Sequence, residues 1–101
     1  MNEVRLRRER IRYTGRVQGV GFRQTVADLA AKRPISGWVC NEPDGSVTCV
    51  AEGQESALEA FIEAIGCAMA AGIESAVRQV EPNEMEVFEG FHIKFSHDSR
   101  R

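Results

Sequence analysis

The hydrophobic pattern changes its period twice in the first third of the chain. Apolar and arginine residues alternate over 9–14, which predicts a strand with one solvated face. After a glycine-rich segment, apolar residues recur at positions 22, 26, 29 and 30, the spacing of one helix face. Pro34 prevents this helix from continuing far beyond Arg33. The pattern therefore predicts a strand, a loop and a helix in succession.

The next segment has the pattern of a hairpin followed by a second helix. Strands are predicted at 35–41 and 47–51, because the turn 42–45 contains Pro-Asp-Gly, which favours a tight reversal. Gly53 ends the second strand. Ser56 and Glu59 have the spacing of a capping box, which predicts a helix beginning near Ser56. Apolar residues at 58, 61, 62 and 65 supply the buried face of that helix.

The last third of the chain contains two candidate strands. Residues 66–72 have no clear period, whereas 73–81 predict a strand and 91–96 alternate as a final edge strand. The order is β-α-β-β-α-β, with two candidate strands in the last strand region. This order predicts an α+β fold, the ferredoxin-like sandwich, in which two helices pack on one face of an antiparallel sheet. We expect one domain over 9–96, a flexible basic segment at 1–8 and a C-terminal tail at 97–101.

Composition narrows the class of protein. A chain of 101 residues forms one domain, and its net charge of −2 gives no overall attraction to nucleic acid or to a membrane. The longest nearly apolar stretch, 64–73, is too short to span a bilayer, and charge follows Met1 where a signal peptide would be apolar. Three cysteines without a C-x-x-C spacing indicate neither disulfides nor zinc. We therefore expect reduced thiols in a cytoplasmic protein. We also expect a monomer, with no metal or cofactor.

Charge is distributed unevenly along the chain. Arginines concentrate in 5–16 and glutamates in 81–89. Two interpretations remain open. In the first, both segments are solvated and lie near each other. In the second, the arginines form a basic patch that steers an anionic substrate.

The segment from Gly15 to Arg23 is the strongest candidate for chemistry. Its glycines, at 15, 19 and 21, allow a tight loop with inward backbone N–H groups, and a helix N-terminus follows. Such a loop forms a nest for a tetrahedral anion such as phosphate, and Arg23 is placed to bind two phosphate oxygens. The spacing matches neither a Walker A motif nor a dinucleotide fingerprint. A tight turn whose glycines serve packing alone is the alternative.

Two motifs resemble the acylphosphatase family. The first is Gly15–Arg23, of sequence GRVQGVGFR, and the second is Gly37–Val47, of sequence GWVCNEPDGSV. Gly53 and the strand around His92 are also similar, so the resemblance covers roughly 9–96. It implies the ferredoxin-like sandwich and hydrolysis of acyl phosphates to a carboxylate and inorganic phosphate. The chain differs from the family's common pattern at Cys40 and within 69–73, which we expect to affect the site rim and substrate preference.

The resemblance also implies the roles of individual residues. Arg23 binds the phosphoryl oxygens, and Asn41 positions the attacking water. Phosphate is held by backbone N–H groups of the loop and by the arginine. The implied phosphate-binding residues are Arg16, Val17, Gln18, Gly19, Val20, Gly21 and Arg23.

The reaction needs little else. An acyl phosphate is a mixed anhydride, and its leaving carboxylate has a conjugate-acid pKa of about 4. It therefore departs without a proton from a general acid, and the motifs contain no histidine to supply one. Positioning and charge stabilisation suffice, without a metal or a covalent intermediate. The expected partners are a small acyl phosphate and its phosphate product.

Two other classes of function remain as alternatives. The first is a module on the same fold that binds phosphate or carbamoyl phosphate without turnover. Similar domains occur at the start of hydrogenase-maturation proteins. An RNA-binding domain is the other, because ferredoxin-like sheets bind RNA through exposed aromatic residues beside basic ones. The arginines of 5–16 keep that reading open, although the chain has only seven aromatic residues.

Five side chains are assigned structural roles. Cys40 should point away from Asn41, because neighbours in a strand face opposite sides. Cys67, like Cys49, is expected to be a small core residue. Asp44 is expected to form the turn, and Gln18 to support the glycine loop by hydrogen bonds.

Overall fold

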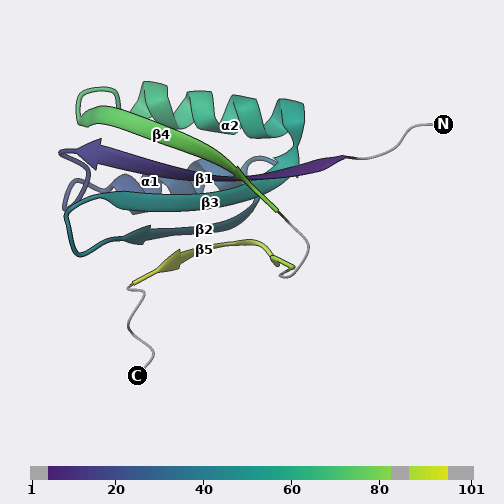
Figure 1. The fold of residues 1–101 in the computed structure, drawn as a ribbon. Coiled ribbons are helices and arrows are strands. Elements are labelled where there is room, and N and C mark those ends of the chain that lie inside the picture. Colours follow the sequence, from purple (N-terminus) through teal and green to yellow (C-terminus); the bar gives the residue numbers. More distant parts are fainter. Residues whose placement is uncertain (1–4, 83–86, 96–101) are drawn as a thin grey trace.

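One five-stranded sheet with two helices on a single side makes up the described fold (Figure 1). The computed structural model describes residues 5–82 and 87–95. The sheet has the order β4-β1-β3-β2-β5, so the first strand of the chain lies in its interior. In chain order the elements are β1 (Leu6–Gly15), α1 (Phe22–Ala31), β2 (Ser36–Asn41), β3 (Val47–Gln54), α2 (Glu55–Ala68), β4 (Ile73–Glu81) and β5 (Phe91–Lys94).

The sheet is mixed, which corrects the expected antiparallel sheet. β1 pairs antiparallel with β3 and β4, and β2 pairs antiparallel with β3. β5 pairs parallel with β2, with Gly37 opposite Phe91. β5 starts at the end of the sheet where β4 finishes, and therefore runs in the direction of β2 (Figure 1).

β1 begins earlier than expected. Leu6 is already paired with Gln54 of β3, so Leu6 to Arg8, assigned above to a flexible segment, belong to the strand. Arg8 is 5% exposed and its guanidinium is bound by Glu52 and stacked on the Phe88 ring. The sequence analysis missed the start of this strand because its partners in the sheet are far away in the sequence. The predicted tail at 97–101 lies outside the described residues.

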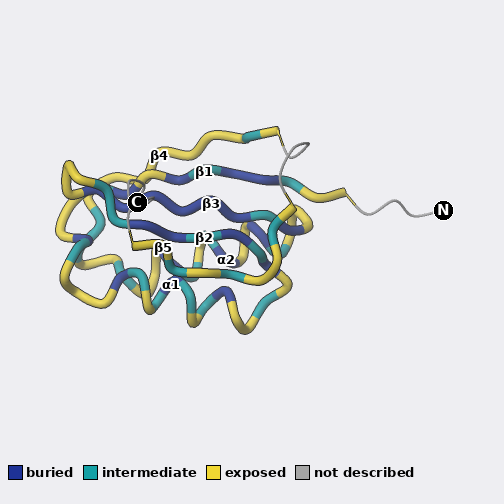
Figure 2. The backbone as a smooth tube through the Cα atoms, turned by 90° about the horizontal axis from the view of Figure 1, so that it is seen from below, coloured by how far each residue is buried: buried dark blue, intermediate teal, exposed yellow. Residues whose placement is uncertain are grey.

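The helices cover one face of the sheet and bury the core against it. Figure 2 shows the buried residues concentrated on β1, β3 and β2, with the helices on one side. α2 begins one residue before Ser56, with Gln54 as its N-cap and no side-chain cap, so the expected capping box is absent. Cys49 is buried as expected, whereas Cys67 near the end of α2 is exposed. The helix residues in the core are Phe22, Val26, Ala30, Leu58, Phe61 and Ile65.

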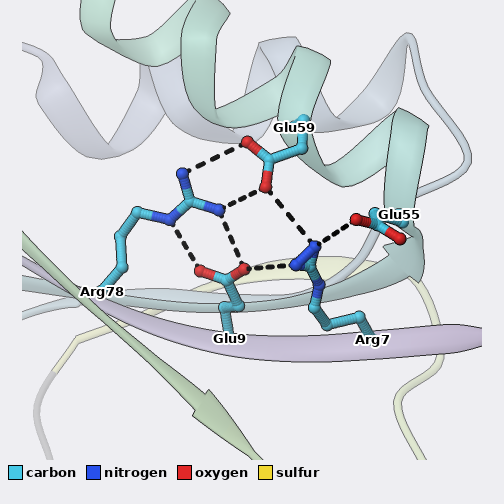
Figure 3. Close-up of polar contacts among 5 residues, drawn as sticks. All are labelled: Arg7, Glu9, Glu55, Glu59 and Arg78. Carbon is cyan, nitrogen blue, oxygen red and sulfur yellow. Dashed lines mark hydrogen bonds and ion pairs between the residues drawn. The ribbon is translucent and has the colours of Figure 1, made fainter.

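An ion-pair cluster of five residues, the α2 cluster, ties α2 to the sheet (Figure 3). Glu9 of β1 is only 3% exposed and accepts hydrogen bonds from Arg78 of β4 at 2.7 and 2.9 Å. Arg78 also donates to Glu59 of α2, and Arg7 contacts Glu55 at 2.9 Å. Hydrogen bonds to Glu9 first, and then to Glu59, raise the pKa of Arg78.

The two oppositely charged segments lie side by side. Arg10 of β1 pairs with Glu81 of β4, its neighbour in the sheet. This pair places the start of the glutamate-rich segment beside the arginine-rich strand. Glu84 and Glu86 lie outside the described residues. No helix within residues 5–82 and 87–95 is long and apolar enough to cross a membrane.

Candidate active site

The predicted site residues gather where β1, β2 and β5 end, at the left of Figure 1. The loop 16–21 leaves β1 and enters α1 there, and Asn41 is the last residue of β2. The register of β2 and β5 pairs Cys40 with Lys94, which brings Phe95 to the same end of the sheet. The topology therefore joins the two sequence motifs at one edge.

The glycine loop has the backbone of an anion nest. Gly19 and Gly21 have φ angles of 76° and 80°, which are left-handed values that favour glycine. Gly21 is the N-cap of α1, so the free N–H groups of the first helical turn face the loop. Within the described residues, no N–H from Val17 to Gly21 donates a hydrogen bond to another protein atom. These donors are available to a phosphate group.

Arg16 differs from the rest of the loop. Its backbone N–H donates to the carbonyl of Gly72 at 2.8 Å, so that group is already used. This corrects the expectation that every N–H from 16 to 21 serves the anion. The contact instead anchors the loop to the connection between α2 and β4.

A cavity of about 280 Å³ contains the main predicted residues. Gly19, Gly21 and Arg23 line it together with Asn41. The cavity therefore joins the nest, a fixed cation and a side-chain amide. Its remaining lining residues are Val17, Phe22, Gln24, Ile93 and Phe95.

Asn41 brings an unpaired acceptor to the site. Its Oδ1 is buried and has no hydrogen-bond partner. A buried carbonyl without a donor is destabilising, by about 1–3 kcal/mol, unless water or a ligand supplies one. Cys40, the preceding residue, is fully buried, and its thiol donates to the backbone carbonyl of Asn41 at 3.2 Å. The cysteine does not line the cavity, in agreement with its expected structural role.

Gln18 connects the loop to the hairpin turn that follows Asn41. Its Nε2 donates to the carbonyls of Glu42 at 2.9 Å and Ser46 at 2.8 Å. This confirms that Gln18 supports the loop by hydrogen bonds, and it identifies the turn as the partner. The amide therefore fixes the distance between the nest and the end of β2.

Asp44 forms the turn as expected. Its Oδ1 accepts hydrogen bonds from the hydroxyl and the N–H of Ser46, at 2.6 and 2.9 Å, and Arg12 binds its other oxygen. The hydroxyl of Ser46 first, then its N–H and Arg12, lower the pKa of Asp44 below its usual value. Asp44 thus stabilises the hairpin that carries Asn41.

Phe95 is a site residue that the sequence analysis did not identify. Its ring is 77% exposed and lies 5.7 Å from the guanidinium carbon of Arg23. The alternation of 91–96 indicated a strand, but nothing in it indicated that this strand would pair with β2. Without that pairing, no sequence signal places Phe95 beside Asn41.

The arginines of β1 are bound to carboxylates. Arg8, Arg10 and Arg12 contact Glu52, Glu81 and Asp44 respectively. Their charges therefore stabilise the sheet and its turn. In the part of the chain that the structure describes, no group of three His, Cys, Asp or Glu side chains converges as a metal site would.

Comparisons with known proteins agree with this geometry. The family model for acylphosphatase matches residues 9–93. An acylphosphatase of Rhizobium etli is 45% identical over 76 residues, which cover 71% of this chain and 81% of that protein. One of Bacillus licheniformis is 41% identical over 86 residues, covering 85% and 96%.

Solved structures extend the likeness to the fold. Acylphosphatase from Bacillus subtilis has a TM-score of 0.77 and 38% identity, covering 89% of this chain and 99% of that one. Full-length HypF, in its phosphate- and nucleotide-bound form, has a TM-score of 0.80 and 27% identity. That match covers 94% of this chain and 12% of HypF.

The matched region contains the glycine loop, both helices and the end of β2. The predicted ferredoxin-like sandwich is confirmed by the arrangement of the elements and by the acylphosphatase structures that share it. This chain therefore belongs to the acylphosphatase family, whose enzymes hydrolyse acyl phosphates.

Proposed function

We propose that the cavity at the glycine loop hydrolyses acyl phosphates without a metal, with Arg23 binding the phosphoryl group and Asn41 positioning the attacking water. The observation that carries this proposal is the shared cavity, which brings Gly19, Gly21, Arg23 and Asn41 together. Each of these groups meets one requirement of the reaction.

Phosphate binding falls to the loop and the arginine. The N–H groups of 17–21 form no other hydrogen bond within the described residues, so they are free to donate to equatorial phosphoryl oxygens. Arg23 adds a planar pair of donors and a full positive charge. Charge that spreads over these oxygens in the transition state is thereby stabilised.

Water positioning falls to Asn41. Its buried Oδ1 accepts a hydrogen bond from water, which satisfies the unpaired carbonyl and aims the water oxygen at phosphorus. The new bond joins that oxygen to phosphorus, and the bond between phosphorus and the acyl oxygen breaks. The acyl group leaves as a carboxylate, and the water's proton passes to a phosphate oxygen. Because the leaving group needs no proton, no general acid is required.

Hydrolysis of benzoyl phosphate in the presence of EDTA tests the proposal. We expect turnover to persist with EDTA, Arg23→Ala to lower kcat/KM by about a thousandfold, and Asn41→Ala to lower kcat by about a hundredfold with little change in KM. Lys32→Ala is the matched control, because this exposed cation lies at the far end of the same helix. Activity that depends on a metal, or that survives in both variants, would contradict the assignment.

A phosphate or carbamoyl-phosphate binding module is the second candidate. The likeness to part of HypF, solved with phosphate and nucleotide bound, favours it. Binding of inorganic phosphate without turnover of benzoyl or carbamoyl phosphate would support this reading and would remove the water-positioning role of Asn41.

A cytoplasmic monomer remains our proposal for the setting of the enzyme. All three cysteines, Cys40, Cys49 and Cys67, are free, and reduced thiols are typical of a reducing compartment. Sedimentation of the purified chain at micromolar concentration tests the monomer.

A further inference from the structure

A second cavity lies against the glycine loop, and Asn41 does not line it. It has a volume of about 290 Å³ and is lined by side chains from the loop, from the end of α2 and from the connection to β4. Val20 lines this cavity, whereas its neighbours Gly19 and Gly21 line the phosphate cavity. The two cavities are therefore adjacent across one residue of the loop. The lining residues are Arg16, Val20, Ala68, Met69, Ala71 and Gly72.

The sheet order associates the two cavities with strands on different sides of β1. β1, which leads into the loop, has β3, β2 and β5 on one side and β4 on the other. The phosphate cavity includes residues at the ends of β2 and β5, and the second cavity includes the turn that enters β4. Figure 1 shows the connection from α2 to β4 beside the end of β1.

The in-line geometry of phosphoryl transfer suggests a role for the second cavity. The attacking water and the leaving group lie on opposite sides of phosphorus in phosphoryl transfer. If Asn41 holds the water on the β2 side, the acyl group leaves toward the β4 side, where Val20 and the second cavity lie.

We propose that the cavity of Val20, Met69 and Ala71 binds the acyl group of the substrate, and that it favours an apolar acyl group of aromatic or branched-chain size. The proposal rests on the proposed function, since it uses the same water and phosphate positions. Val20 is 44% exposed, an apolar side chain that a bound acyl group would cover.

The chemistry of the lining agrees with such an occupant. Most lining side chains are aliphatic, and Met69 supplies a flexible thioether that adapts to different shapes. Arg16 is the one charged lining residue, and it forms no ion pair with a carboxylate in the described part of the chain. Its positive charge would attract an anionic substrate.

The backbone holds the cavity in place. The hydrogen bond from the N–H of Arg16 to the carbonyl of Gly72 joins the two walls. A Cβ at Gly72 would lie 2.3 Å from the carbonyl oxygen of Arg16, so only glycine permits this approach. The acyl cavity is thus built into the same backbone contact that anchors the phosphate loop.

Kinetics with benzoyl phosphate and acetyl phosphate test this inference. Ala71→Trp fills the cavity, and we expect it to lower kcat/KM for benzoyl phosphate about tenfold more than for acetyl phosphate. Met69→Ala removes a wall and should raise KM for benzoyl phosphate selectively. Ala31→Trp is the control, since this exposed alanine lies at the last residue of α1, away from the loop.

A binding measurement separates failure of this inference from failure of the proposed function. Phenacylphosphonate and acetonylphosphonate are non-hydrolysable analogues of the same two substrates, and calorimetry reports their affinities without turnover. The inference predicts that wild type prefers the phenacyl compound and that Ala71→Trp loses the preference. Equal affinities in wild type, or equal effects of Ala71→Trp on both compounds, overturn the inference. Absence of turnover together with a retained preference overturns the hydrolase reading alone.

Discussion

Gln18 offers a test of how the nest and the water site are held together. Its Nε2 donates to two carbonyls of the hairpin turn, those of Glu42 and Ser46, at 2.9 and 2.8 Å. A typical hydrogen bond contributes about 1 kcal/mol net to stability. We therefore expect Gln18→Ala to lower the free energy of unfolding by about 2 kcal/mol, which is roughly a thirtyfold change in the folding equilibrium.

Gln18→Glu is the sharper variant because it keeps the shape and removes the donor. The substituted carboxylate would face two carbonyl oxygens, which repel it, in a partly buried position. We expect it to lower stability by at least about 3 kcal/mol, since an unpaired charged group costs more than a lost neutral bond. Glutamate should therefore be worse than alanine at this position.

We also expect these variants to lose activity, because a shift of the turn changes the geometry of the site. If the turn shifts, Asn41 moves relative to the nest, and a displacement of about 1 Å lowers a rate about a hundredfold. We expect kcat for benzoyl phosphate to fall by up to that factor. Phosphate affinity should change less in Gln18→Ala, because the loop N–H groups remain.

Urea unfolding and steady-state kinetics of both variants provide the measurements. Gln79→Ala is the control, because Gln79 is exposed on β4 away from the site. If both Gln18 variants stay within about 0.5 kcal/mol of wild type, or glutamate is no worse than alanine, then hydrogen-bond donation does not hold the turn.

Two further predictions concern the charged groups of the sheet. Arg78→Met leaves Glu9, only 3% exposed, without its main partner. We expect this variant to lower the free energy of unfolding, measured with urea, by about 2 kcal/mol. The control is Arg12→Met, whose ion pair is half exposed, and a loss no larger than in this control contradicts the role of the α2 cluster. The lowered pKa of Asp44, caused first by Ser46, means that its stabilisation is complete above about pH 4 and is lost as the pH falls below that value. Asp44→Asn should therefore flatten the stability profile below pH 4, and an unchanged acid profile refutes this.

The order of elements and the phosphate loop could be predicted from local sequence. The alternation of 9–14, the helical spacing that starts at Phe22 and the Pro-Asp-Gly turn each act over a few residues. Arg23 and Asn41 were found through the two motifs that contain them, and both line the same cavity. These features depend on local conformation, which can be predicted from a single sequence.

The features that the sequence did not predict depend on distant pairing. Leu6 is a strand residue because Gln54 of β3 pairs with it, and β5 is parallel because of where β4 finishes. Phe95 reaches Arg23 for the same reason. Val20 and Ala71, which line the cavity proposed for the acyl group, are likewise brought together by the packing of the loop against the connection to β4.

The interior position of β1 has a consequence for how the enzyme acquires its activity during synthesis. Arg10 and its partner Glu81 are separated by 71 positions, and the phosphate loop is anchored by a bond from Arg16 to Gly72. A nascent chain therefore exposes one edge of β1 until β4 has emerged, and pairing at such separation is slow. We therefore expect the anion nest, although encoded near the N-terminus, to become rigid only when nearly the entire domain has left the ribosome. Phosphate binding by stalled nascent chains of increasing length should then appear abruptly once β4 is available.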